Sequence, residues 1–413
     1  MRFVSTLALS VTLALAGATV VGVQPAVAKD KKAESGPAPK LSKPVRDALQ
    51  AAQTAIKAGD LATGEAKLNE AKAAATTDDE KYYAGSIMYD LGQKQSNAAK
   101  QGEAIDMMLA SGKVPAANQA LFYFTSGQLA YQAKDLNKAE QQLTKAVQAN
   151  VNDPNAYALL VETKNQQGKP AEAIQMLEQA IAKQKAAGQT VPNEWYARGI
   201  SIGYQAKLAP QLEQLTQEWL AAYSTPSNWR DSLITYRDLN KVDPDYELDL
   251  MRLMRAANAL KGERDYMDYV QATYLRFPTE ANAVIDEGVA SGNIKLTGTA
   301  AELKNVVKGK LAADKTATQS AANDLKAGKG TAKLALGTAD ALYGAGDFAQ
   351  AAEIYKVALQ KGGLDANLVN SRLGASLARA GQADAAKQAF GAVTGPRQGL
   401  AKYWMVWIDH KPA

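Results

Sequence analysis

The sequence predicts an all-α fold built from antiparallel helix pairs, and two observations lead to this prediction. The chain of 413 residues is rich in Ala, Gln, Lys, Leu and Glu but holds only 6 Phe and 14 Pro, which is typical of amphipathic helices rather than of sheets. The second observation is a 34-residue period, at which the same residue types return in order. The repeating pairs are Tyr123 and Tyr157, Ala139 and Ala173, Leu143 and Leu177, and Ala146 and Ala180.

The small residues of this period indicate close crossings between helices. Ala139 and Ala146 lie two turns apart on one helical face, where a larger side chain would hold two helix axes apart. Leu143 lies between them on that face and is expected to fill the space toward the neighbouring helices. Because each pair buries one stripe against its own partner and another against the next pair, a single pair is not stable alone. We therefore expect the pairs to stack.

Residues that favour helix starts fall where this register needs them. Asp135 can cap the second helix of a pair, and Gly-Asp recurs at 59–60 and at 346–347. Pro154 and Pro170 stand in the first turns of the next two helices, a position that proline tolerates because its missing N–H would be unsatisfied there anyway.

The pattern resembles the tetratricopeptide repeat, whose units are antiparallel helices A and B with a large and a small residue in helix A and small residues in helix B. The resemblance implies a right-handed α-solenoid. A third unit, marked by Trp195 and Gly199, begins four positions later than the period predicts, and the extra residues fall at 186–189. Gly346 to Leu359 is the best match to the repeat, and Gly381 to Phe390 repeats it at almost the same spacing.

Other parts of the chain read as helices without the repeat signature, at 78–112, 226–295 and 296–330. Five segments are therefore expected along the chain. They are a signal peptide over 1–28, a flexible Lys/Pro/Gly linker over 29–44, an N-terminal solenoid over 45–225, degenerate helical repeats over 226–330, and a C-terminal repeat pair with a capping helix over 331–413.

The first residues are typical of an export signal. Arg2 supplies a positive charge, Val4 to Val23 is apolar apart from small polar residues, and Ala26-Val27-Ala28 offers a small-residue cleavage pattern. An uncleaved membrane anchor is the alternative, because about 20 apolar residues can just span a bilayer. We expect cleavage before Lys29, a periplasmic protein, and no transmembrane segment after cleavage. With no cysteine in the chain, disulfides and a lipidated cysteine are excluded.

The basic charge of the chain lies mainly outside the predicted folded body. Residues 29–44 hold five Lys against one Asp and one Glu, which is most of the net charge of +5. A linker that carries the excess charge indicates a solvated tether rather than a nucleic-acid-binding face. No nucleic-acid partner is predicted.

The residues that most catalytic and metal sites use are scarce. The chain has one histidine, His410, and no cysteine, which removes the usual nucleophile–base pairs and zinc ligand sets. The stretch Lys326 to Thr331 resembles a phosphate loop only superficially, because Asn323 and Gly330 stand where the motif needs Gly and Ser or Thr. We expect no enzyme activity, no cofactor and no bound metal.

These observations predict a non-catalytic scaffold or adaptor of the cell envelope that binds an unidentified protein or peptide partner. The resemblance implies that helix A residues line a concave groove for that partner. The alternative is an accessory subunit of a polysaccharide or peptidoglycan assembly or export machine, in which the same surface contacts glycan. The candidate groove residues are Gln128, Tyr131, Gln132, Glu162, Asn165, Gln166, Tyr196 and Tyr204.

The C-terminal residues predict one more amphipathic helix. Tyr403, Trp404, Trp407 and Ile408 share one helical face. We expect this helix to cover the open core of the last repeat, because an uncapped solenoid end is insoluble. A docking site for another protein is the alternative, since exposed aromatic side chains are good anchors.

Overall fold

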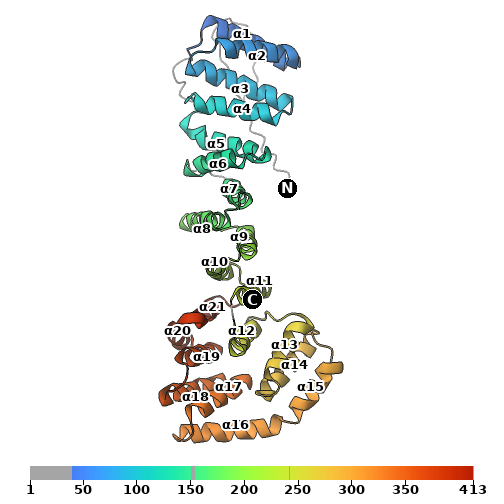
Figure 1. Cartoon of the computed structure of the whole chain (residues 1–413), viewed down its shortest axis with the longest axis vertical. Coiled ribbons are helices and arrows are strands. Elements are labelled where there is room, and N and C mark those ends of the chain that lie inside the picture. Colours follow the sequence, from blue (N-terminus) through green and yellow to red (C-terminus); the bar gives the residue numbers. More distant parts are fainter. Residues whose placement is uncertain (1–39, 150–153, 241, 413) are drawn as a thin grey trace, which may run out of the picture. The chain divides into compact units, whose positions relative to one another are not determined.

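The computed structural model describes residues 40–149, 154–240 and 242–412, and this part of the chain folds into helices and turns without a β-strand (Figure 1). It contains α1 to α21 and one short 3-10 helix, η1. Consecutive helices pack against each other, as in the pairs α1 and α2, α3 and α4, α5 and α6, α17 and α18, and α19 and α20. The predicted all-α arrangement of stacked helix pairs is confirmed.

The chain divides into two compact units, Met1–Leu177 and Glu178–Ala413, and α8 crosses the boundary between them. The helices up to α8 are α1 (Lys43–Lys57), α2 (Leu61–Ala74), α3 (Asp78–Lys94), α4 (Ala98–Ala110), α5 (Ala116–Gln132), α6 (Leu136–Gln148), α7 (Pro154–Gln166) and α8 (Pro170–Ala186). The second unit continues with α9 (Asn193–Gln205), α10 (Ala209–Ala222), α11 (Pro226–Leu239), α12 (Pro244–Ala256), α13 (Gly262–Thr273), α14 (Pro278–Ala290), α15 (Gly298–Lys308), α16 (Leu311–Lys326), α17 (Ala332–Gly344), α18 (Phe348–Lys361), α19 (Ala366–Arg379), α20 (Ala383–Gly391), η1 (Gly395–Arg397) and α21 (Gln398–Asp409).

The unit boundary differs from the predicted boundary at 225/226. A single buried apolar cluster runs from Leu220 to Trp407. The predicted segments 226–330 and 331–413 therefore share one core, and the lack of a repeat signature in 226–330 does not mark a separate domain.

The repeat register places the expected residues in the core. Ala139, Leu143 and Ala146 are fully buried in α6. A Cβ added to Gly127 of α5 would lie 2.6 Å from Cγ of Leu143, and one added to Gly374 of α19 would lie 2.6 Å from Cε1 of Phe390. The glycine precedes the large residue by the same number of positions in both pairs. Only glycine allows this approach, because real Cβ contacts are not that short.

The expected helix caps form. Asp60, Asp135 and Asp347 each accept a hydrogen bond from the backbone N–H three residues later, at 3.0, 3.0 and 3.2 Å. The residue before each aspartate adopts a positive φ, and at one of the three positions this residue is Lys134, with a φ of 63°. Each cap satisfies a backbone donor that the helix itself leaves free.

The predicted linker over 29–44 ends earlier than expected. Its residues 29–39, like the predicted signal peptide over 1–28, lie outside the described residues. Leu41 is buried, and the backbone N–H of Ser42 donates to Oε1 of Glu80 at 2.9 Å. Helix α1 begins at Lys43, with Pro44 in its first turn. These contacts attach the chain to the start of α3, so residues 41–44 belong to the folded unit.

Helix α21 has more contacts than an end cap needs. Its Trp404 stacks on Phe390 of α20 with ring centroids 6.1 Å apart, so the helix packs against the last repeat. Tyr403 and Thr216 of α10 also share a hydrogen bond of 2.6 Å, and Nε1 of Trp407 donates to the carbonyl of Ala256 at 3.1 Å. The C-terminal helix therefore fills a space between elements that are far apart in sequence.

Candidate functional site

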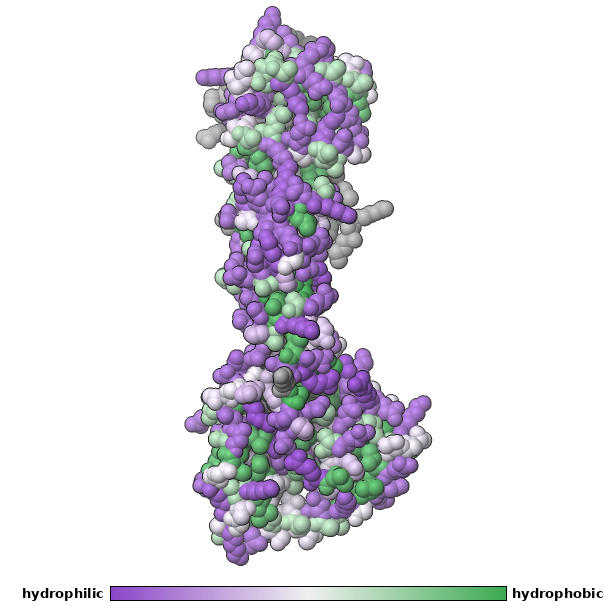
Figure 2. All heavy atoms as spheres, viewed as in Figure 1, coloured by the Kyte–Doolittle hydropathy of each residue, from purple (hydrophilic) through white to green (hydrophobic). Residues whose placement is uncertain are grey.

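Six of the predicted groove residues lie in the first unit, three on α5 and three on α7, two helices that contact each other. We name this group the α5–α7 surface; it consists of Gln128, Tyr131, Gln132, Glu162, Asn165 and Gln166. Gln132 and Gln166 are exposed, and the other four are half-buried. Figure 2 shows one face of the molecule, which is largely hydrophilic around α6 to α8. All six polar side chains are therefore at least partly accessible to solvent.

Hydrogen bonds join three residues of the α5–α7 surface. Nε2 of Gln166 donates to the hydroxyl of Tyr131 at 2.6 Å and to Oε1 of Glu162 at 3.1 Å. Glu162 and Gln166 are neighbours because they lie one helical turn apart on α7. Tyr131 is 35 residues before Gln166, so the contact links equivalent faces of two successive repeats. The repeat spacing was the sequence signal that found this cluster.

The other two predicted residues lie in the second unit and do not belong to this surface. Tyr204 is 43% exposed, and its hydroxyl donates to Oδ2 of Asp238 at 3.2 Å. Tyr196 is fully buried, and its ring makes an edge contact with Tyr223 at 6.2 Å between centroids. Burial raises the pKa of the Tyr196 hydroxyl. The prediction that Tyr196 faces a groove is therefore wrong.

The reason for this error is the four-residue shift between the second and third units. The third unit is shifted, so that Trp195 follows Tyr157 by four positions more than the 34-residue period. Tyr204 follows Gln166 with the same shift, so it is predicted in the correct register. Tyr196, by contrast, follows Glu162 at the unshifted repeat spacing. Applying the shift to Glu162 gives Ile200, which is half-buried, whereas Tyr196 lies one turn earlier, in the first turn of α9, where it is fully buried.

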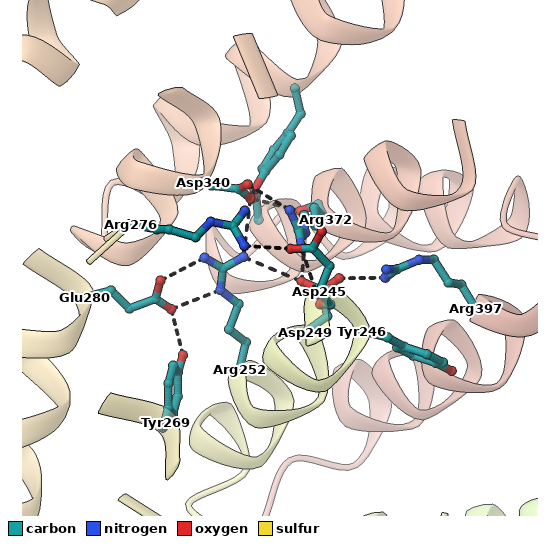
Figure 3. Close-up of polar contacts among 12 residues, drawn as sticks. Asp245, Tyr246, Asp249, Arg252, Tyr269, Arg276, Glu280, Asp340, Arg372 and Arg397 are labelled. Atoms are coloured by element: carbon teal, nitrogen blue, oxygen red, sulfur yellow. Dashed lines mark hydrogen bonds and ion pairs between the residues drawn. The ribbon is translucent and has the colours of Figure 1, made fainter. Parts of the chain in front are cut away.

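The second unit contains a buried charge network that the sequence analysis missed. We define it as Asp249, Arg252, Glu280, Asp340, Arg372 and Arg397 (Figure 3). Arg252 of α12 forms two hydrogen bonds with Glu280 of α14, one from Nε at 3.0 Å and one from Nη2 at 2.8 Å. Its Nη1 also contacts Oδ1 of Asp340 of α17 at 3.4 Å. Arg252 therefore connects three helices.

Arg372 and Arg397 complete the network around Asp249. Arg372 of α19 donates from Nε to Asp249 and from Nη1 to Asp340, both at 2.8 Å. Arg397, at the end of η1, donates to the other oxygen of Asp249 at 2.7 Å. Three guanidinium groups thus face three carboxylates, and the formal charges cancel.

Two buried tyrosines donate the remaining hydrogen bonds. Tyr269 donates to Glu280 at 2.7 Å, and Tyr355 donates to Asp340 at 2.6 Å. Burial raises the pKa of both hydroxyls, and the adjacent carboxylates raise it further, so both stay protonated as donors. All six carboxylate oxygens of the network accept a hydrogen bond. Such complete pairing offsets the cost of taking the charges out of water.

Arg252 keeps its charge in this environment. Burial by itself lowers the pKa of a guanidinium, but the neighbouring Glu280 and Asp340 raise the pKa of Arg252 well above its ordinary value. Its guanidinium also lies over the ring of Tyr343, 4.7 Å from the centroid, a favourable cation–π contact.

The sequence did carry a signal for this network. Asp249 and Arg252 are three positions apart in α12. Each has an apolar residue directly before and after it in the sequence. A helix that is apolar on all sides is buried on all sides, and buried charges are almost always paired. The identity of the partners carried no such signal, because Arg372 is 123 residues from Asp249.

Two further structural features bear on the functional class. Within the described ranges, no group of three or more His, Cys, Asp or Glu side chains is placed to hold a metal ion. No helix in the described part of the chain is both long and apolar enough to cross a membrane.

Comparisons with known proteins show similarity at the level of repeat architecture. No protein-family model matches the chain. No curated protein sequence matches it either. A tetratricopeptide repeat protein from Parabacteroides merdae is similar with a TM-score of 0.31 and 12% identity, over 81% of this chain and 100% of that one. The pentatricopeptide repeat protein PPR10 from maize is similar with a TM-score of 0.31 and 12% identity, over 88% of this chain and 62% of that one. At these TM-scores the fold assignment rests on the helix packing described above.

Proposed function

We propose that the chain is a non-catalytic interaction scaffold of the cell envelope, and that it binds an extended peptide or a partner helix on the α5–α7 surface. The observation that carries this proposal is the contact of Gln166 with Tyr131 and Glu162. It holds an aromatic ring, an amide and a carboxylate together across two repeats, with part of each side chain open to solvent.

The chemistry of the surface supports a polypeptide partner. Amide side chains such as Gln132 and Asn165 can donate to and accept from a peptide backbone. A half-buried tyrosine offers apolar area at low entropic cost, because its ring is already held. The hydrogen bonds of Gln166 reduce the ordering that binding would otherwise require.

The second unit supports a structural rather than a catalytic role for its buried acids. A general base needs a free carboxylate oxygen within reach of a substrate proton. Asp249, Glu280 and Asp340 have both oxygens engaged by Arg or Tyr donors. His410, the single histidine, is exposed at the end of α21.

Export to the periplasm is part of the proposal and rests on the sequence of residues 1–28. Intact-mass measurement of the purified protein should give a mature chain that begins at Lys29, recovered from the periplasmic fraction. A mass that retains residues 1–28, recovered from the membrane pellet, would contradict export by cleavage.

Site-specific photocrosslinking tests the binding surface. Benzoylphenylalanine replaces Gln132 at the end of α5 or, as a matched control, Gln141 of α6; both glutamines are exposed and both belong to the first unit. After irradiation of intact cells, we expect covalent adducts from the position 132 variant and few from the control. Equal adducts from both positions, or adducts from position 141 alone, would place the partner elsewhere.

A further inference from the structure

The second unit contains a pocket that has no part in the proposed partner binding. Its volume is about 180 Å³, and it lies where α12, α13 and α14 face α17, α18 and α19. Its walls include Arg255, Tyr269, Tyr343, Phe348 and Arg379. No Asp or Glu stands among the residues that line it.

Three arginines line this pocket, and two of them have carboxylate partners: Arg252 belongs to the buried charge network described above. Arg255 pairs through its Nε with Glu287 at 2.8 Å. Arg379, by contrast, forms no ion pair with any described carboxylate; its guanidinium lies 4.5 Å from the ring centroid of Phe348. A guanidinium has five N–H donors in a planar fork that matches a carboxylate. The pocket therefore offers one uncompensated positive charge beside unused donors.

The other residues that line the pocket are aromatic or small. Phe348 and Tyr343 form an edge contact, with ring centroids 5.1 Å apart and planes at 70°. The Tyr343 side chain is buried, and its hydroxyl has no hydrogen-bond partner in the described part of the chain. Aromatic faces of this kind favour a flat apolar group. For scale, a protein cavity of about 150 Å³ can hold benzene, so the present volume suits one ring with a small substituent.

We propose that this pocket binds a small organic anion in which a carboxylate is attached to a flat apolar group. The carboxylate pairs with Arg379 and Arg255 at the mouth, and the ring lies against Phe348 and Tyr343. The ligand is either a free aromatic acid or the C-terminal residue of a peptide, since both carry this chemistry. A bound carboxylate supplies the partner that Arg379 lacks, which favours an anion over a neutral isostere.

Titration calorimetry on the purified chain tests this pocket without any knowledge of a protein partner. The probes are phenylacetate, its neutral isostere phenylacetamide, acetate and inorganic phosphate. We expect phenylacetate to bind with a dissociation constant of about 1–10 mM, a range reasonable for so small a ligand, and about tenfold more tightly than phenylacetamide. A further pair, N-acetyl-Gly-Gly-Phe with a free or an amidated C-terminus, identifies the source: tighter binding of the free peptide acid than of phenylacetate points to a peptide.

Variants assign the binding to the pocket. Arg379→Gln should weaken phenylacetate binding about tenfold. Arg264→Gln is the matched control, because the Arg264 side chain is 89% exposed on α13 and does not line the pocket; it should change the affinity by less than about twofold. Equal binding of phenylacetate and phenylacetamide, equal effects of the two variants, absence of saturation with phenylacetate, or tighter binding of acetate or phosphate than of phenylacetate would each overturn the proposal.

Discussion

Both units contain close glycine crossings, and they differ in the buried ion-pair network that the second unit adds. In the first unit the crossing of α5 and α6 depends on the absence of a side chain at Gly127, which lets Leu143 approach. In the second unit the helices around α12 are joined by buried ion pairs, such as that of Arg252 with Glu280. Apolar crossings tolerate small adjustments, whereas a buried charge must find its partner or destabilise the fold. The second unit should therefore be more sensitive to the loss of a single polar group.

The largest expected effect is that of Arg252→Met, which keeps much of the apolar stem but leaves Glu280 and Asp340 without this partner. Breaking a buried pair in this way costs about 3–5 kcal/mol of unfolding free energy. All five tryptophans, at positions 195, 219, 229, 404 and 407, belong to the second unit, so urea denaturation followed by tryptophan fluorescence reports on that unit.

Arg264→Met is the matched control for this measurement, because the Arg264 side chain is 89% exposed. Its unfolding free energy should change by no more than about 0.5 kcal/mol. Equal midpoints for the two variants would mean that the buried network does not stabilise the second unit.

The next prediction compares the loss of a tyrosine hydroxyl in each of the two units. Tyr269→Phe removes a buried hydroxyl that donates to Glu280 at 2.7 Å, and Tyr131→Phe removes a half-buried hydroxyl that accepts from Gln166 at 2.6 Å. We expect a loss of about 1.5–3 kcal/mol for the buried bond to a charged group and about 0.5 kcal/mol for the other. Urea denaturation followed by far-ultraviolet circular dichroism measures both. A larger loss for Tyr131→Phe would reverse the comparison between the units.

Overpacking tests the apolar crossing of the first unit. Gly127→Ala places a Cβ 2.6 Å from Leu143 Cγ and should cost about 1–3 kcal/mol. Gly337→Ala in α17 is the control, because an added Cβ there meets nothing within 4 Å and should leave stability unchanged or raise it by up to about 1 kcal/mol. In thermal denaturation, similar losses for both substitutions would mean that the close approach of residue 127 to Leu143 does not decide the cost.

The last expected effect concerns an ion pair of the first unit. Glu140 of α6 accepts from Lys164 at 2.6 Å and from Lys169 at 3.0 Å. The pKa of Glu140 is lowered from its ordinary value of 4.5 to about 2, and the hydrogen bond from Lys164 is the largest cause of this shift. A carboxyl group whose pKa is lower in the folded than in the unfolded chain stabilises the fold at any pH above its unfolded pKa. This stabilisation is lost as the pH falls toward the folded pKa.

Glu140→Gln should therefore destabilise the chain by about 1 kcal/mol at pH 7. The difference from the wild type should shrink between pH 4.5 and pH 2, as thermal denaturation at a series of pH values would show. A difference that stays constant over this range would mean that Glu140 contributes packing rather than charge.

The α5–α7 surface shows how far a repeat carries prediction. The repeat spacing led to Tyr131 and Gln166, which the structure brings into contact. It failed at Tyr196, because the four-residue shift of the third unit was not applied to that position. The pocket around Arg379 had no sequence signal, since its walls come from six helices without a common period.

The sequence by itself determined the helices, their caps and the pairing of neighbours. Those features depend on residues within one repeat of each other, as Asp135 caps α6 and Gly127 meets Leu143. Only the tertiary structure decided that α21 returns to α10, and that Arg397 reaches Asp249 across 148 residues. Periodicity reports which face of a helix is apolar, but the choice of a distant partner depends on how the intervening helices stack, and a buried charge reveals only that some partner must exist.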